Sequence, residues 1–176
     1  MSSRMDILVY TLNRFPELEQ TYNQSEIAVF VAVAKDLIER YIGGIVFHAI
    51  LTRKFVVFEG SILIPTIKLN EVQSVQLLYP YDNLAVNIQD LQVFENGLVK
   101  IPYPITGYAS VTFDAGYDEN ELPLDLIEAA AQITYHIANL NPQLASANVG
   151  NVSMRFTETS IPPSAKEILD RYRLGL

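Results

Sequence analysis

The sequence predicts an α+β fold: a small helical core of two long helices plus a C-terminal helix, with an inserted antiparallel β arm. Two observations carry this prediction. Apolar residues recur at helical spacing over residues 22–41 and again over residues 123–140. Between these stretches, residues 45–113 alternate apolar with polar side chains and contain repeated turn signals. Helices on both sides of an antiparallel insertion are typical of the α+β class.

The predicted elements divide the chain unequally. We expect a single helical domain over residues 1–141, with its β insertion at about 45–113, followed by a flexible C-terminal segment over residues 142–176 that ends in a short helix. A chain of 176 residues is long enough to enclose a core. Its hydrophobic content of 49% and charged content of 18% also leave apolar side chains that contacts with other subunits would bury.

Composition argues against several classes of function. The net charge of −8 disfavours general binding to DNA, RNA or a membrane surface, because such binding depends on Lys and Arg. The absence of cysteine excludes disulfides, thiolate zinc sites and a cysteine nucleophile. No apolar run reaches membrane-spanning length, and the N-terminus does not resemble a signal peptide. We therefore expect a protein made in the cytosol that does not act at a membrane.

The first elements are helical. A short helix is expected before Pro16. The first long helix follows, with Thr21 and Gln24 as a predicted capping box and Ser25 as a rival cap one turn later. Gly43-Gly44 ends this helix, because glycine readily adopts the left-handed conformation that closes a helix.

The middle of the chain predicts strands. Residues 55–58 and 62–64 are expected to pair as a hairpin around Glu59-Gly60-Ser61. A further strand is expected over 72–79. Asn96-Gly97 predicts a second hairpin, in a turn whose two central residues both have positive φ. Residues 108–114 alternate strictly and predict a half-buried strand.

The last elements are again helical. Pro123 suits the first turn of a helix, and Glu121, Asp125 and Glu128 lie near its positive end. Asn141-Pro142 stops that helix, and residues 142–161 show no helical period. Pro162-Pro163 then begins a short helix.

Residue chemistry predicts no catalytic residue, no metal site and no cofactor. His48 and His136 each lack a partner at ligand spacing, so structural or surface roles are favoured for both. Asp118, Glu119 and Glu121 do not match a calcium loop, and solvated carboxylates ahead of a helix are the preferred interpretation.

The order of elements resembles the head–tail connector proteins of tailed bacteriophages, also called adaptor or head-completion proteins. Four stretches over residues 22–174 carry this resemblance: Asp36–Tyr41; Leu63-Ile64-Pro65 with Val72–Val75; Val111–Tyr117 with Leu122–Ile127; and Val149–Met154 with Ile168–Tyr172. One departure is Gly43-Gly44, where the family often has Cys or Arg.

The resemblance implies a structural virion protein without enzymatic activity, located at the neck of the particle and in the host cytoplasm during assembly. It implies a homo-oligomeric ring, usually of twelve subunits, beneath the portal protein. Such a ring extends the DNA channel, retains the packaged genome without binding it specifically and presents a surface to the next neck or tail protein. Two alternatives stay open: a tail-completion or tail-terminator ring, and a small-ligand-binding or enzymatic module.

Two sets of residues are candidates for these contacts. The first is a portal-docking set on the C-terminal helix, which consists of Ile168, Leu169, Arg171, Tyr172 and Arg173. The second is an acidic, channel-facing set without nearby bases, which consists of Asp114, Asp118, Glu119 and Glu121. For the first set an alternative stays open, in which the C-terminal helix folds back on its own subunit as a third core helix.

Overall fold

The computed structural model describes residues 6–140 and 161–175, and it confirms the α+β class. The chain forms two compact units. A helical unit comprises Met1–Gly43 and Asp118–Leu176, and a β unit comprises Gly44–Tyr117 between them in sequence. The expected insertion at 45–113 falls within the β unit. The expected loop at 142–161 lies almost wholly outside the described residues.

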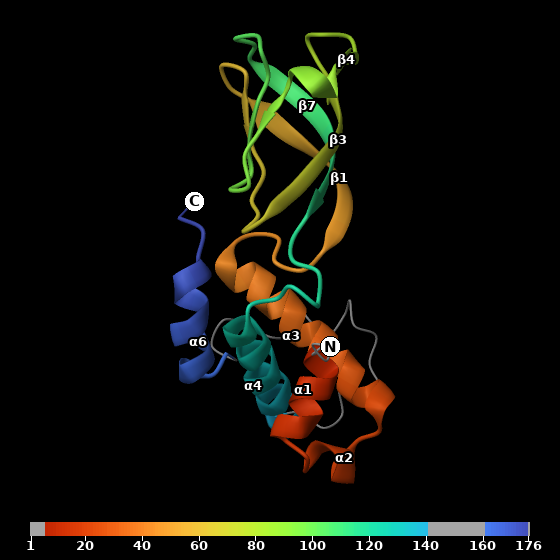
Figure 1. Cartoon of the computed structure of the whole chain (residues 1–176), viewed down its shortest axis with the longest axis vertical. Coiled ribbons are helices and arrows are strands. Elements are labelled where there is room, and N and C mark those ends of the chain that lie inside the picture. Colours follow the sequence, from red (N-terminus) through yellow and green to blue (C-terminus); the bar gives the residue numbers. More distant parts are fainter. Residues whose placement is uncertain (1–5, 141–160, 176) are drawn as a thin grey trace. The chain divides into compact units, whose positions relative to one another are not determined.

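The helical unit contains the elements coloured red to orange and teal to blue in Figure 1. Their bounds are α1 Ile7–Arg14, α2 Leu18–Thr21, α3 Gln24–Ile42, α4 Leu124–Leu140, α6 Pro163–Leu169 and the 3₁₀ turn η5 Asp170–Tyr172. α4 packs against α1, α3 and α6. Its small and apolar residues are therefore buried on several sides, and Ala130, Ile133 and Ile137 are fully inaccessible to solvent.

The start of α3 differs from the predicted capping box. Asn23 is the N-cap: its side chain accepts from the backbone N–H of Glu26, and the Glu26 side chain accepts from the N–H of Asn23. Thr21 is unavailable as a cap because it ends the preceding helix, α2. The end of α3 is as predicted, since Gly43 has a left-handed φ of 84° and donates its N–H to the carbonyl of Glu39.

The β unit contains two antiparallel sheets. The first has strand order β1-β7-β3-β4 and the second β2-β6-β5. Their bounds are β1 Ala49–Val57, β7 Gly107–Ala115, β3 Leu69–Leu77, β4 Leu84–Val86, β2 Ser61–Leu63, β6 Leu98–Lys100 and β5 Gln92–Val93, with the 3₁₀ turn η1 at Ile88–Asp90. Buried side chains of both sheets, such as Val111 and Val99, form one core cluster.

Two features of the β unit correct the sequence-based prediction. The expected hairpin of 55–58 with 62–64 reduces to one bridge between Phe58 and Ser61, because β1 pairs along its whole length with β7 and β2 pairs with β6. At Asn96-Gly97 only Gly97 has positive φ. The loop has three residues, and Gly97 N–H donates to Phe94 C=O, so only its last residue needs the left-handed conformation.

Candidate functional site

The C-terminal helix packs on its own subunit. α6 lies beside α4 and also contacts α3 (Figure 1). Ala165 and Leu169 are completely buried there. Leu169 is therefore a core residue of the helical unit, and its side chain is not available to a partner in this conformation. The described part of the segment follows the alternative in which it serves as a third core helix.

Two tyrosine–aspartate hydrogen bonds hold the chain that follows α6. Tyr172 donates to Oδ1 of Asp125 at 2.7 Å, and Tyr41 donates to Oδ1 of Asp170 at 2.7 Å. The guanidinium of Arg173 lies 5.3 Å from the centre of the Tyr41 ring. These contacts join the C-terminal segment to α4 at one point and to α3 at the other.

The remaining members of the predicted docking set differ in exposure. Arg171 and Arg173 are exposed, whereas Ile168 and Tyr172 are half-buried. The Arg171 side chain is 63% exposed although Nη1 lies 3.4 Å from Oδ2 of Asp125. An ion pair this exposed holds its arginine weakly, so Arg171 remains able to meet a partner's carboxylate.

Asp114, in the β unit, is not the unopposed carboxylate that the sequence predicted. Asn70 donates to its Oδ1 at 3.0 Å, and Nε2 of His48 lies 3.1 Å from the same oxygen. The hydrogen bond from Asn70 and the contact with His48 hold the pKa of Asp114 below its ordinary value, against the opposing effect of burial. His48 therefore contacts a carboxylate of the sheet rather than a second ligand-type histidine.

The other three acidic residues lie in the helical unit, ahead of α4. Glu119 forms a 2.6 Å ion pair with Nζ of Lys35, so it also has a base beside it. Glu121 donates its backbone N–H to the carbonyl of Asp118, which tightens the turn before α4. The partners of Asp114 and Glu119 lie far away in sequence, which is why the acidic stretch looked free of bases.

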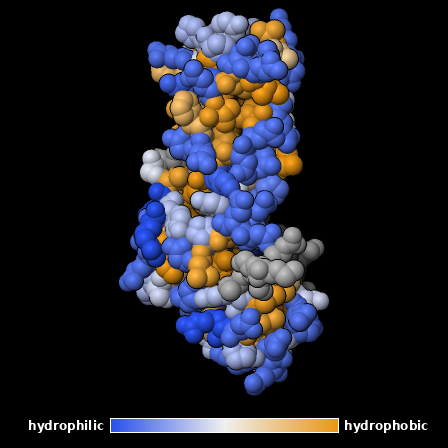
Figure 2. Space-filling view, viewed as in Figure 1, coloured by the Kyte–Doolittle hydropathy of each residue, from blue (hydrophilic) through white to orange (hydrophobic). Residues whose placement is uncertain are grey.

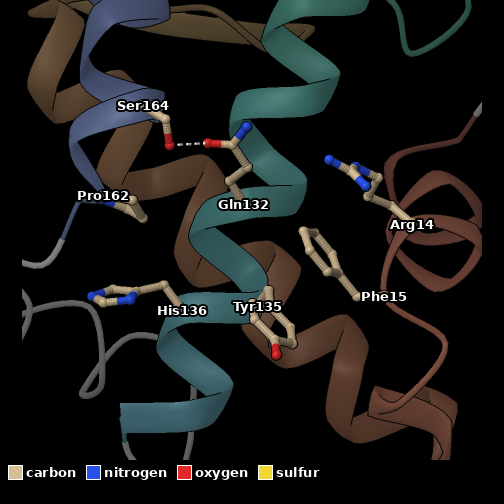
Figure 3. Close-up of a pocket in the computed structure, with 7 residues that line it drawn as sticks. All are labelled: Arg14, Phe15, Gln132, Tyr135, His136, Pro162 and Ser164. Atoms are coloured by element: carbon tan, nitrogen blue, oxygen red, sulfur yellow. Dashed lines mark hydrogen bonds between the residues drawn. The ribbon is translucent and has the colours of Figure 1, made fainter.

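A pocket of about 300 Å³ opens on the helical unit, and sequence reasoning did not find it. Figure 3 shows its lining from the end of α1, from α4 and from the start of α6: Arg14, Phe15, Gln132, Tyr135, His136, Pro162 and Ser164. The rings of Phe15 and Tyr135 stack with centroids 4.3 Å apart. The Ser164 hydroxyl donates to Oε1 of Gln132 at 2.6 Å and is thus held by a neutral amide.

Glu128 connects this lining to α1. Its carboxylate accepts from Tyr10 at 2.6 Å and from Gln132 at 2.8 Å, and Nε of Arg14 lies 3.5 Å away. Burial alone would raise the pKa of Glu128, but these hydrogen bonds and the charge of Arg14 outweigh it and hold the pKa below its ordinary value. The polar groups here fasten α1, α4 and α6 together.

Across residues 6–140 and 161–175, no three His, Asp or Glu side chains gather as metal ligands. Within the same ranges, no helix combines the length and the apolar character needed to cross a membrane.

The fold and these contacts define a small α+β protein whose polar side chains fasten its elements to one another. Residues 7–174 match the family described as "Head completion protein", and the chain belongs to this family. It is therefore a structural virion protein of the head–tail connector class and not an enzyme, as the resemblance implied. A search of the curated proteins found no match.

Solved structures share the fold at low sequence identity. A chain from the neck of an empty gene transfer agent (GTA) particle, computed with C6 symmetry, aligns with a TM-score of 0.63 and 15% identity over 88% of this chain and 83% of that one. A chain from the neck of a native GTA particle, computed with C12 symmetry, aligns with a TM-score of 0.61 and 13% sequence identity. That alignment covers 100% of this chain and 98% of the other chain. A chain from the virion of a native GTA particle aligns with a TM-score of 0.59 and 15% sequence identity. That alignment covers 88% of this chain and 82% of the other chain.

Proposed function

We propose that the protein forms a closed ring beneath the portal in the neck of a phage particle, with twelve copies in the virion. In this position the ring extends the DNA channel, retains the packaged genome and offers the attachment surface for the next neck or tail protein. The observation that carries the proposal is the family match over residues 7–174. The likeness to neck chains from particles computed with C6 and C12 symmetry supports a cyclic arrangement.

Counting copies tests the ring directly. Electron microscopy and mass measurement of assembled necks are expected to find a cyclic multiple of this chain, because closed point-group symmetry is how identical subunits usually assemble. Free protein is compatible with the proposal as a monomer, with the ring formed on the portal. A single copy per particle contradicts it.

For portal docking we propose the exposed rim of the C-terminal segment, centred on Arg171 and Arg173. Leu169 supports this rim from the core, and Ile168 and Tyr172 flank it. The double variant Arg171→Glu with Arg173→Glu is expected to stay folded but to fail to join filled heads, whereas Arg171→Lys with Arg173→Lys retains the charge and joins. If both double variants join filled heads equally well, the docking surface does not include Arg171 and Arg173.

The channel wall is proposed to include Asp118, Glu119 and Glu121 of the helical unit and Asp114 of the β unit. Like charge on the wall and on the phosphates lets DNA pass without adhering. The ion pair of Glu119 with Lys35 and the contact of Asp114 with His48 both reduce this repulsion.

A further inference from the structure

Three apolar side chains form a row across the outward face of the first sheet of the β unit. Val56 of β1 is the register partner of Tyr108 of β7, and Leu78, directly after β3, donates its N–H to the Tyr108 carbonyl at 2.7 Å. The next residues on the two strands, Val57 and Ala109, are buried in the core. Val56 and Tyr108 therefore point outward, and they are 62% and 55% exposed. We name Val56, Leu78 and Tyr108 the Tyr108 row.

Two further apolar side chains are exposed at the same end of the sheet. Phe58 follows the end of β1 and is 64% exposed, and Tyr79 follows Leu78 and is 82% exposed. In the opposite direction the face turns polar at once, because the next row consists of Lys54, Ser110 and Gln76. Most exposed apolar side chains of this face therefore lie at one end, although Ile50, at the other end of β1, is also exposed.

A second row crosses the outward face of the other sheet. Leu63 of β2 is the register partner of Leu98 of β6, and Phe94, directly after β5, donates its N–H to the Leu98 carbonyl at 2.9 Å. The neighbouring pair, Ile62 with Val99, is fully buried, so the row points away from the core. Leu63 is 52% and Phe94 is 42% exposed. We name Leu63, Phe94 and Leu98 the Phe94 row.

The two rows lie on different faces of the β unit. The inward residues of both sheets belong to the same core cluster, so the outward face of each sheet points away from that core. A ring of identical subunits needs two different surfaces on each subunit, one for each neighbour. An isologous dimer would need only one surface, which pairs with itself.

We propose that the Tyr108 row of one subunit packs against the Phe94 row of the next copy of this chain, and that this contact closes the ring. The inference rests on the proposed ring. Buried aromatic side chains dominate interface energetics, and each removes about 150–250 Å² from water when fully buried. The Tyr108 row with its flanks therefore supplies several hundred Å², a substantial part of the ~800 Å² per partner of a standard interface. Figure 2 shows apolar side chains gathered on the surface of the β unit, at the top of the view.

Introduced cysteines test this contact, because the chain has none of its own. Particles are assembled with the double variant Tyr108→Cys, Phe94→Cys, oxidised, dissociated and analysed without reductant. The contact predicts a ladder of disulfide-linked multimers up to the full ring. Each single variant is expected to stay monomeric, since its cysteine meets an unmodified row. Both positions are partly exposed, and an unchanged melting temperature of the purified variant checks the fold.

A matched control pairs Phe94→Cys with Thr52→Cys. Thr52 shares the outward face and strand with Val56 but lies about 13 Å further along β1. This pair should give no ladder. A neck with many copies but no Tyr108–Phe94 ladder overturns this contact and leaves the ring intact, as does a disulfide dimer of Tyr108→Cys alone. A single copy per particle overturns both the ring and the contact.

Discussion

The hydroxyl of Tyr172 lies 2.7 Å from Oδ1 of Asp125 and donates a hydrogen bond to it. The same carboxylate oxygen accepts the N–H of Leu126 at 2.9 Å, which fixes the carboxylate at the start of α4. The C-terminal segment is thereby tied to one long helix, while Tyr41 and Asp170 tie it to the other. The segment that the sequence presented as an arm for docking is, over its described residues, part of the helical unit.

Tyr172→Phe is expected to lower the free energy of unfolding by about 0.5–1.5 kcal/mol, because Asp125 loses one of its donors. Leu169→Ala should cost more, about 2–5 kcal/mol, since it empties a fully buried position. Tyr103→Phe, at an exposed tyrosine of the β unit, is the matched control and should change little. Denaturant unfolding measures all three. Equal stabilities would mean that the C-terminal segment contributes nothing to the core.

The packing of α4 on its neighbours gives a second prediction. Ala130 is completely buried, and Ala130→Asp would place a charge there with no partner. We expect a loss of about 4 kcal/mol or more, which leaves little folded protein. Leu124→Asp serves as the control: Leu124 is 61% exposed and lies in the first turn of α4, where a carboxylate is tolerated. A soluble Ala130→Asp variant of unchanged stability contradicts the packing.

Local signals predicted much of the fold. The period of the buried residues gave both long helices, although these begin at Gln24 and Leu124 and the helical core also contains α1 and α2. Gly43 ended α3 as expected, and strict alternation located β7. Of the two predicted caps of α3, Thr21 lies two residues before the observed cap and Ser25 two residues after it. α2 has too few residues to show a period that would have excluded Thr21. The hairpin of β1 with β2 is reduced to its turn, because turn chemistry reports only on neighbours in sequence, while the strand partner of β1 is β7.

The candidate site was less predictable for the same reason. Whether a carboxylate is opposed depends on side chains brought close by folding, and Lys35 lies on α3, far from Glu119 in sequence. The burial of Leu169 depends on α4 and could not be separated from a partner-facing stripe by periodicity alone. The pocket at Phe15 and Tyr135 joins two helices that are distant in sequence, so no local motif marks it.

Two glycines with nearly the same φ provide a matched test of backbone strain and close contact. Gly43 has φ of 84° and open space around it, so Gly43→Ala should cost only the left-handed strain, about 1–2 kcal/mol. Gly97 has φ of 86°, but an added Cβ would collide with the carbonyl oxygen of Ile64. Gly97→Ala should therefore be clearly the more destabilising in thermal unfolding. Equal losses would indicate that the loop can move away from Ile64.

The carboxylate of Glu128 predicts a pH dependence. Its pKa is lower in the folded protein than the ordinary value of 4.5. The stabilising contribution of this carboxylate is therefore fully present above about pH 4.5 and is lost as the pH falls through the lower folded pKa. Glu128→Gln should be less stable than the wild type at neutral pH and should lose less stability on acidification. If the free energy of unfolding falls by the same amount on acidification in the wild type and in Glu128→Gln, this assignment is contradicted.

Purified protein should not retain duplex DNA at about 0.15 M salt, because the net charge is −8 and retention requires Lys and Arg free to meet phosphates. Several of the cations already have carboxylate partners, among them Lys35 with Glu119 and Arg14 with Glu128. A mobility-shift series across salt concentrations measures this.

The triple variant Asp118→Lys, Glu119→Lys and Glu121→Lys should gain retention of DNA that falls steeply with added salt, because it replaces repulsion by phosphate contacts. Tight, salt-sensitive binding by the unmodified protein would instead reveal a basic surface, and an acidic channel wall would then no longer explain how DNA passes without adhering.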